Sequence, residues 1–269
     1  MKKNTKIIFS PKKELGQNFI FNDYYLNEIT KKIPINEKTI IIEIGSGYGN
    51  LTKFLSNTKC KKIISIEKDK KIFQWLKKNI KDKKIIFLNN DALKINWEKL
   101  CISYINFSLI IVGNLPYNIA NSLLIKLLIY KNFFSIFVFL VQKELAEKWT
   151  SGPKKNNSKY SALSVFINCF SEIKKVLNIP KNIFIPKPKV DGTLLIIKKK
   201  DHKFDEKKKI FFLNFVKKCF FFRRKNILKN LSSEKWKKFF LERKYSFLLR
   251  PQEMDKEFYL EIFEFDNIN

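Results

Sequence analysis

Apolar residues recur in short runs along residues 1–200, and polar stretches with helical spacing separate most of these runs. Runs of Ile, Leu, Val and Phe without alternation are typical of strands that are buried on both faces of a parallel sheet. The pattern predicts strands at 39–44, 62–67, 85–88, 109–112, 136–141, 173–177 and 194–197, and helices at 23–32, 70–79, 119–130 and 143–150. This alternation predicts an α/β fold with a doubly wound, mainly parallel sheet.

The pattern changes near residue 200. Residues 198–209 contain seven lysines and three acids, which is typical of a charged linker. Beyond it, apolar residues return at helical spacing: Phe211, Phe212, Phe215, Val216, Cys219 and Phe220. We therefore expect two domains, a larger α/β domain over 1–200 that begins with a basic arm, and a small all-helical domain over 201–269.

Glycine and proline mark two further connections. Residues 151–159 are polar and include a Gly-Pro pair, which predicts a loop. Residues 179–190 contain Pro180, Pro186 and Pro188, so we expect this segment to be extended and stiff.

Composition narrows the class of protein. Hydrophobic residues make up 45% of the chain and aromatic residues 15%, which is enough for a large core. No apolar run has the length of a membrane span, and the apolar patch after the first lysines is too short for a signal peptide. The four cysteines lack C-x-x-C spacing and the only histidine is His202. We expect free thiols, no metal site and a cytoplasmic protein.

The net charge is +29, from 54 basic and 25 acidic residues. A charge of this size favours a polyanionic partner, and nucleic acid is the first candidate. An alternative is that an AT-rich genome has biased the codons, because Lys, Ile, Asn and Phe are abundant throughout the chain. Charge alone leaves both explanations open.

Glycines gather at the end of the first predicted strand. The chain has only seven, and Gly45, Gly47 and Gly49 lie within Glu-Ile-Gly-Ser-Gly-Tyr-Gly at 43–49. Such a loop permits a tight strand-to-helix turn and a close approach of a ligand to the backbone. Its spacing differs from the Gly-x-Gly-x-x-Gly of dinucleotide sites. A plain tight turn is the alternative interpretation.

Carboxylates mark the ends of the next two predicted strands. Glu67 ends the second strand, where a carboxylate suits two ribose hydroxyls, and Asp91 follows the third, where it can accept a hydrogen bond from an adenine amine. Taken singly, each could be a solvated helix cap. Because the carboxyl ends of parallel strands share one edge of the sheet, the ordered set with the glycine loop predicts an S-adenosylmethionine site.

The sequence Asn-Leu-Pro-Tyr at 114–117 follows the fourth strand. The nitrogen of an adenine amine is a poor nucleophile because its lone pair is delocalised into the ring. The side-chain oxygen of Asn114 and the carbonyl of Leu115 can accept both of its hydrogens and localise that pair. Pro116 would hold the backbone and Tyr117 would stack on the base. This is catalysis by positioning and electrostatics, and it needs no metal.

Phe184 lies within the proline-rich segment. A base in structured RNA must leave its stack to reach such a site, and Phe184 would form a second aromatic wall for it. With 27 phenylalanines in the chain, a core position is the alternative.

Together these motifs resemble the ribosomal RNA adenine N6-dimethyltransferase family over nearly the whole chain. The matching segments are 15–19, 43–49, 114–117, 141–147 and 184–191. The resemblance implies a Rossmann-like S-adenosylmethionine-dependent methyltransferase sheet with a small C-terminal all-helical domain. It also implies a catalytic set of Asn114, Leu115, Pro116, Tyr117 and Phe184, and donor contacts from Asn18, Ile20, Gly45, Gly47, Glu67, Asp91 and Asn114.

Two branches of the family differ in substrate. One dimethylates two adjacent adenosines in a hairpin loop near the 3′ end of 16S rRNA during assembly of the small ribosomal subunit. The other modifies a large-subunit adenosine and confers macrolide resistance. Residues 222–228 and 249–253 resemble the small-subunit branch, which implies 16S rRNA in the small subunit as the partner of a monomeric enzyme. A non-catalytic RNA-binding assembly factor and the large-subunit enzyme remain the alternatives.

The chain departs from the family pattern at three positions. Ser161 and Ala162 stand where the small-subunit branch usually has Gly and Arg, and Gly192 replaces a usual Ser. The change at Ala162 puts one RNA or packing contact in doubt.

Residues 217–244 carry eleven basic residues and two acids, so we expect them to grip RNA phosphates unless they are simply a solvated helix face.

Overall fold

The computed structural model describes residue 12, residues 15–130 and residues 133–268. A seven-stranded sheet lies at its centre, with the strand order β4-β3-β2-β5-β6-β9-β7. The strands β2 to β6 are parallel, and β9 runs antiparallel to both of its neighbours. The bounds are β2 (Thr39–Ile44), β3 (Lys62–Glu67), β4 (Ile85–Asn89), β5 (Ser108–Asn114), β6 (Ile136–Gln142), β7 (Ser171–Ile179) and β9 (Gly192–Lys199).

Helices cover both faces of this sheet because its strands are apolar on both sides. Neighbouring residues of β2 show this, since Ile40 and Ile42 pack into one core and Ile41 into the other. The helices on the Ile41 side are α1 (Asp23–Lys32), α2 (Asn50–Ser56) and α3 (Lys70–Asn79). Those on the opposite side are α4 (Trp97–Cys101), α5 (Tyr117–Ile129), α6 (Lys143–Trp149) and α7 (Ala162–Phe170). The predicted doubly wound, mainly parallel sheet is confirmed.

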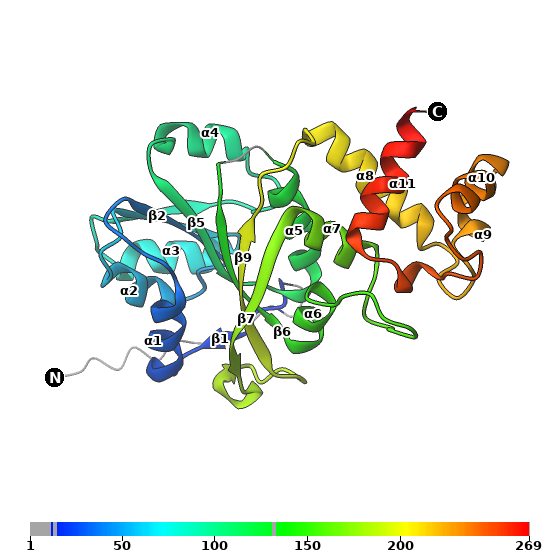
Figure 1. The fold of residues 1–269 in the computed structure, drawn as a ribbon. Helices are drawn as coiled ribbons and strands as arrows, with labels where there is room; N and C mark the ends of the chain where they lie inside the picture. The colour runs from blue at the N-terminus through cyan, green and yellow to red at the C-terminus, as the bar shows by residue number, and fades with distance from the viewer. Residues whose placement is uncertain (1–11, 13–14, 131–132, 269) are drawn as a thin grey trace.

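The C-terminal part is helical and packs against α7 and α5 at one end of the sheet (Figure 1). It consists of α8 (Glu206–Cys219), α9 (Leu228–Leu231), α10 (Glu234–Glu242) and α11 (Lys256–Ile268). The predicted linker at 198–209 was wrong at both ends. Lys199 still belongs to β9 and Glu206 already starts α8, with Asp205 as its N-cap.

The two parts share one core. The Phe212 ring of α8 lies 5.8 Å from the Phe170 ring of α7, and both belong to the cluster that also fills the α5 side of the sheet. Lysines in the connecting segment therefore do not imply a loose tether. The division at residue 200 stays a prediction.

Two short strands were not predicted. β1 (Phe19–Ile20) pairs antiparallel with β8 (Phe184–Ile185), which brings together segments more than 160 residues apart.

The segment 179–190, expected to be extended, contains a 3-10 turn, η3 (Lys181–Ile183), and a cis peptide before Pro186. The loop predicted at 151–159 contains no helix or strand. Within the described residues, no helix is long and apolar enough to cross a membrane.

Candidate active site

A cavity of about 190 Å³ lies at the carboxyl ends of β2, β3, β5 and β6. Open α/β sheets bind ligands at this edge. The cavity is lined by every residue of the predicted site, namely Asn18, Ile20, Gly45, Gly47, Glu67, Asp91, Asn114, Leu115, Pro116, Tyr117 and Phe184. The structure thus gathers the whole set in one place, and the role of each member stays a prediction.

Two glycines of the loop after β2 serve different purposes. Both Gly45 and Gly47 have positive φ, 72° and 55°, which favours glycine. A Cβ on Gly47 would lie 2.7 Å from the Phe19 ring, so this glycine makes room for the N-terminal segment. A Cβ on Gly45 would meet only the carbonyl of Asn114, at 3.8 Å. The floor of the cavity over Gly45 is therefore open to a ligand.

Glu67 is held in one orientation at the end of β3. The backbone N–H of Gly47 donates to its Oε2 at 2.9 Å, and that of Asp69 donates to its Oε1 at 2.8 Å. Burial raises the pKa of this carboxyl, although the backbone hydrogen bonds oppose the change. A carboxylate fixed on both oxygens at a cavity wall is preorganised to accept hydroxyl hydrogens.

Asp91 belongs to the turn after β4. Lys68 Nζ lies 2.9 Å from its Oδ2, and the N–H of Leu93 donates to its Oδ1 at 2.9 Å. Burial disfavours ionisation, but the hydrogen bonds from Lys68 and Leu93 outweigh it, and the pKa of Asp91 lies below its usual value. Asp91 is therefore an ionised acceptor at the cavity.

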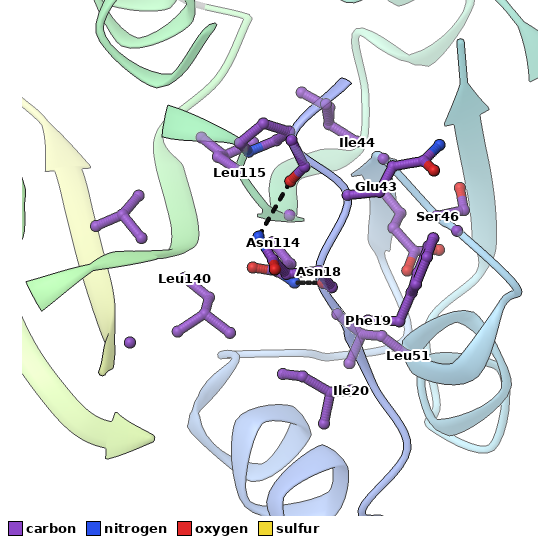
Figure 2. A pocket seen from close by; sticks show the side chains of 18 of the residues that line it. Asn18, Phe19, Ile20, Glu43, Ile44, Ser46, Leu51, Asn114, Leu115 and Leu140 are labelled. Atoms are coloured by element: carbon purple, nitrogen blue, oxygen red, sulfur yellow. Dashed lines mark hydrogen bonds between the residues drawn. The ribbon is translucent and has the colours of Figure 1, made fainter. Parts of the chain in front are cut away.

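Asn114 ends β5 beside the N-terminal segment (Figure 2). Its Nδ2 donates to the carbonyl of Asn18 at 2.7 Å. Because a carbonyl only accepts, this contact fixes the orientation of the amide and leaves Oδ1 as an acceptor. The next residue, Leu115, is tied to the sheet by its N–H, which donates to Leu140 O at 2.9 Å. Pro116 is the N-cap of α5, and its carbonyl accepts from Ala120 N at 3.2 Å.

The two predicted aromatic walls differ in exposure. Tyr117, the first residue of α5, is 50% exposed, whereas Phe184 is 5% exposed and packs in the core beneath α1. A Cβ on Gly192 would lie 3.0 Å from the Phe184 ring, so the glycine at this position leaves room for that ring. Phe184 is both a core residue and part of the cavity wall, and its stacking role stays a prediction.

The N-terminal segment is anchored across the sheet edge by side chains. Asn50 Nδ2 donates to the carbonyl of Ile20 at 2.7 Å, and Lys12 Nζ lies 2.9 Å from Asp69 Oδ2. The resemblance placed Asn18 and Ile20 at the donor site, and the structure adds how they are held there. The anchor Asn50 was missed, because no local pattern links it to a segment 30 residues earlier.

Glu43 was also missed as a functional candidate. It is 2% exposed, lines the cavity and accepts a hydrogen bond from Thr52 Oγ1. Burial raises the pKa of this carboxyl to about 8. The available signal was a lone acid inside the apolar strand Thr-Ile-Ile-Ile-Glu-Ile.

Part of the basic segment 217–244 contacts the protein itself. Arg223 donates to the carbonyl of Asn157, Arg243 Nε lies 2.7 Å from Glu261, and Lys235 Nζ lies 2.8 Å from Asp266. The prediction that this segment grips RNA therefore needs the remaining basic residues.

The departure at Ser161 has a local explanation, because its side chain forms a capping box with Ser164 at the start of α7.

The described residues hold no cluster of three or more His, Cys, Asp or Glu side chains that could bind a metal. The polar side chains that line the cavity are instead carboxylates and amides, and Gly45 leaves space over the backbone. These features fit the ribose and adenine of S-adenosylmethionine. Strand order, glycine loop and cavity together define the class of the protein. It has the Rossmann-like sheet of S-adenosylmethionine-dependent methyltransferases, with a helical C-terminal part.

Comparison with known proteins narrows this class. A dimethyladenosine transferase from Plasmodium falciparum matches with a TM-score of 0.73 at 24% identity, covering 93% of this chain and 98% of that one. The 23S rRNA methyltransferase ErmE matches with a TM-score of 0.65 at 19% identity, covering 91% and 98%. Both likenesses show the fold.

The sequence itself matches the model of the family "Ribosomal RNA adenine dimethylase" over residues 8–268. A protein from Mycoplasma mobile named Ribosomal RNA small subunit methyltransferase A is 36% identical over 94% of this chain and 96% of its own. One of the same name from Natranaerobius thermophilus is 33% identical over 83% and 78%. The chain belongs to the ribosomal RNA adenine dimethylase family.

Proposed function

We propose that this chain transfers methyl groups from S-adenosylmethionine to N6 of two adjacent adenosines in a hairpin loop near the 3′ end of 16S rRNA. The observation that carries the proposal is the fixed amide of Asn114 at the sheet edge, with Oδ1 left to accept a hydrogen bond. Relatives that match most of the chain are named as small-subunit rRNA methyltransferases, which supports the choice of RNA.

Some residues around the cavity would hold the methyl donor, and others would hold the target adenosine. Glu67, fixed by two backbone N–H groups, would accept the ribose hydroxyls, and ionised Asp91 would accept from the adenine amine. The open floor at Gly45 would let the ligand approach the backbone. When bound, S-adenosylmethionine supplies an electrophilic methyl group on a sulfonium.

The chain's own part in the transfer is positioning. Asn114 Oδ1 and the Leu115 carbonyl would accept the two N6 hydrogens and localise the nitrogen lone pair toward the methyl group. The hydrogen bond from the Leu115 N–H to the Leu140 carbonyl would keep these acceptors in place. Pro116 and the start of α5 would hold the chain that follows them. As the N–CH3 bond forms, the S–CH3 bond breaks and S-adenosylhomocysteine leaves as a neutral thioether. The product nitrogen is then cationic and loses a proton to water, so no strong general base is required.

The target adenosine would leave the hairpin stack to enter the cavity. Half-exposed Tyr117 would offer the first aromatic face, and Phe184 the second. The proposal includes action as a monomer in the cytoplasm, where small subunits carrying 16S rRNA are assembled.

Incubation with labelled S-adenosylmethionine and purified ribosomal subunits from a strain that lacks this modification tests the proposal. We expect label in 30S particles and none in 50S particles. Label in 50S particles alone would make the chain a large-subunit enzyme. No label in either, together with donor binding and 30S binding, would make it a non-catalytic assembly factor.

A further inference from the structure

Lys126 lies on α5 and reaches toward the turn that carries Asp91. Its Nζ donates to the carbonyl of Leu93 at 2.7 Å and to that of Ile95 at 3.4 Å. These are contacts between an ammonium group and backbone oxygens from an element more than 30 residues away. Hydrogen bonds from a charged donor are stronger than those between neutral groups.

The turn that Lys126 holds is folded around Asp91. The N–H of Leu93 donates to Asp91 Oδ1 at 2.9 Å, and the carbonyl of Asp91 accepts from Lys94 N at 2.8 Å and from Ile95 N at 3.1 Å. Leu93 therefore uses its N–H to hold the Asp91 carboxylate and its carbonyl to bind Lys126. Leu93 thus links the Lys126 ammonium group to the side chain of Asp91, a residue that lines the cavity.

The same helix begins at the other half of the site. α5 starts at Tyr117, directly after Asn114 and Pro116, and packs against the sheet through Leu123, Leu124 and Leu127. Lys126 thus joins the helix that carries the Asn-Leu-Pro-Tyr sequence to the turn that carries Asp91. The contact therefore ties the position of the turn around Asp91 to α5.

Apolar packing secures the turn independently of Lys126. Ala92 is 5% exposed and Ile95 6% exposed, and both belong to the core under α5. Removal of the ammonium group should therefore loosen the orientation of the turn rather than unfold it.

We propose that Lys126 is a positioning residue for the methyl donor: it fixes residues 91–95 so that the Asp91 carboxylate stays directed at the cavity. This rests on the proposed function only in taking Asp91 as a contact for the donor. The fixing of the turn by Lys126 stands apart from the reaction that the site performs.

The test uses the full-length chain with Lys126→Met, which keeps the aliphatic part of the side chain and removes Nζ. Lys126→Arg keeps a cation, and Lys53→Met, an exposed lysine on α2, is the matched control. The measurements are the Kd for S-adenosylhomocysteine by calorimetry, KM and kcat for methyl transfer, and hydrogen exchange at the amides of Leu93, Lys94 and Ile95.

For Lys126→Met we expect the Kd for S-adenosylhomocysteine and the KM for the donor to rise about tenfold, with kcat and the KM for RNA nearly unchanged. The three amides should exchange faster, Lys126→Arg should restore most of the affinity, and Lys53→Met should match the wild type.

An unchanged Kd together with unchanged amide exchange would overturn the proposal. So would a fall in kcat and a rise in the KM for RNA of the same size as the change in donor affinity, because that pattern indicates general damage to the fold. If the wild-type chain bound S-adenosylhomocysteine but methylated no RNA, the proposed function would fail. The affinity and exchange measurements would still decide the role of Lys126.

Discussion

Among single residues, Asn114 has the most direct role in the proposed reaction, because its environment fixes the direction of its amide. The contact from Nδ2 to Asn18 O occupies the donor side, so Oδ1 is the group presented for a target amine. We predict that Asn114→Ala lowers kcat at saturating donor by about 10²-fold or more, which is typical for loss of one preorganised hydrogen-bonding partner at a reacting atom. RNA affinity, measured by filter binding, should stay nearly unchanged.

One further variant and one contradicting outcome sharpen this prediction. Asn114→Asp keeps an acceptor but loses the donor to Asn18 O, so it should also fail to hold the N-terminal segment. An equal loss of kcat and of RNA affinity in Asn114→Ala would mean that Asn114 mainly supports the fold.

Glu43 gives the protein a distinctive dependence on pH. Its folded-state pKa of about 8 lies above the ordinary 4.5, so the folded protein retains a proton that the unfolded chain releases. The stability from protonated Glu43 is complete below about pH 4.5 and is lost as the pH rises through about 8. Relative to Glu43→Gln, the free energy of unfolding of the wild type should fall in this range by up to about 1.4 kcal/mol per pH unit.

Chemical denaturation of both proteins at several pH values measures this difference. Curves that run parallel from pH 5 to pH 8 would show that Glu43 does not titrate between the folded and unfolded states in this range.

A site residue is predictable when neighbouring residues in the sequence mark it, and unpredictable when its partner lies far away in the chain. Glu67 and Asp91 are predictable because Glu67 ends an apolar strand and Asp91 follows one, which are local patterns. Asn50 and Lys126 were not, because their partners, Ile20 and the 91–95 turn, become neighbours only when the sheet has formed. The sequence predicts Phe184 as a wall of the site, and its near-complete burial shows that it also belongs to the core.

Among the elements, the pairing of β1 with β8 closes the site over the glycine loop. The Phe19 ring packs where a Cβ of residue 47 would lie, at 2.7 Å, and Gly47 also has positive φ. We predict that Gly47→Ala displaces β1, lowers the unfolding midpoint and weakens S-adenosylhomocysteine binding about tenfold or more, measured by calorimetry.

Gly152→Ala is the matched control, since a Cβ there would meet nothing within 4 Å. It should leave both the midpoint and the affinity at their wild-type values. Wild-type affinity in Gly47→Ala would mean that Phe19 does not shape the donor site.

The elements also differ in how far the sequence predicts them. β2 and β3 have the predicted bounds, because long apolar runs ending in a glycine or an acid carry their own boundary signals. β1 and β8 have two residues each and exist only as each other's partner, so no local pattern marks them. The connection after β9 is shorter than predicted because its lysines are not all solvent-exposed: Lys209 is 5% exposed and donates to Leu128 O at the end of α5.

At the scale of the whole molecule, the net charge of +29 should govern RNA binding rather than donor binding. We predict that affinity for 30S particles falls about 10³-fold or more between about 50 and 200 mM salt, because phosphate contacts release counterions. Affinity for S-adenosylhomocysteine should change little over the same range. RNA affinity that did not depend on salt would favour codon bias as the origin of the charge.

The molecule as a whole shows what composition could and could not decide. Periodicity predicts the sheet and the helical C-terminal part but not their shared core, since that core depends on α8 docking against α7. Composition predicts that the basic segment 217–244 grips RNA phosphates or forms a solvated helix face, yet Arg223 and Arg243 contact the protein itself. Charge counts do not distinguish such internal contacts from a surface that is free to bind phosphates.

The most direct test of the central claim maps the methylated nucleotides by mass spectrometry. Particles of the 30S subunit that lack the modification are incubated with S-adenosylmethionine and either the wild-type chain or Asn114→Ala, and the rRNA is digested. We predict N6,N6-dimethyladenosine at two adjacent positions near the 3′ end of 16S rRNA, four methyl groups per particle, with the wild type only. Dimethyladenosine elsewhere, or equal modification by Asn114→Ala, would contradict the account.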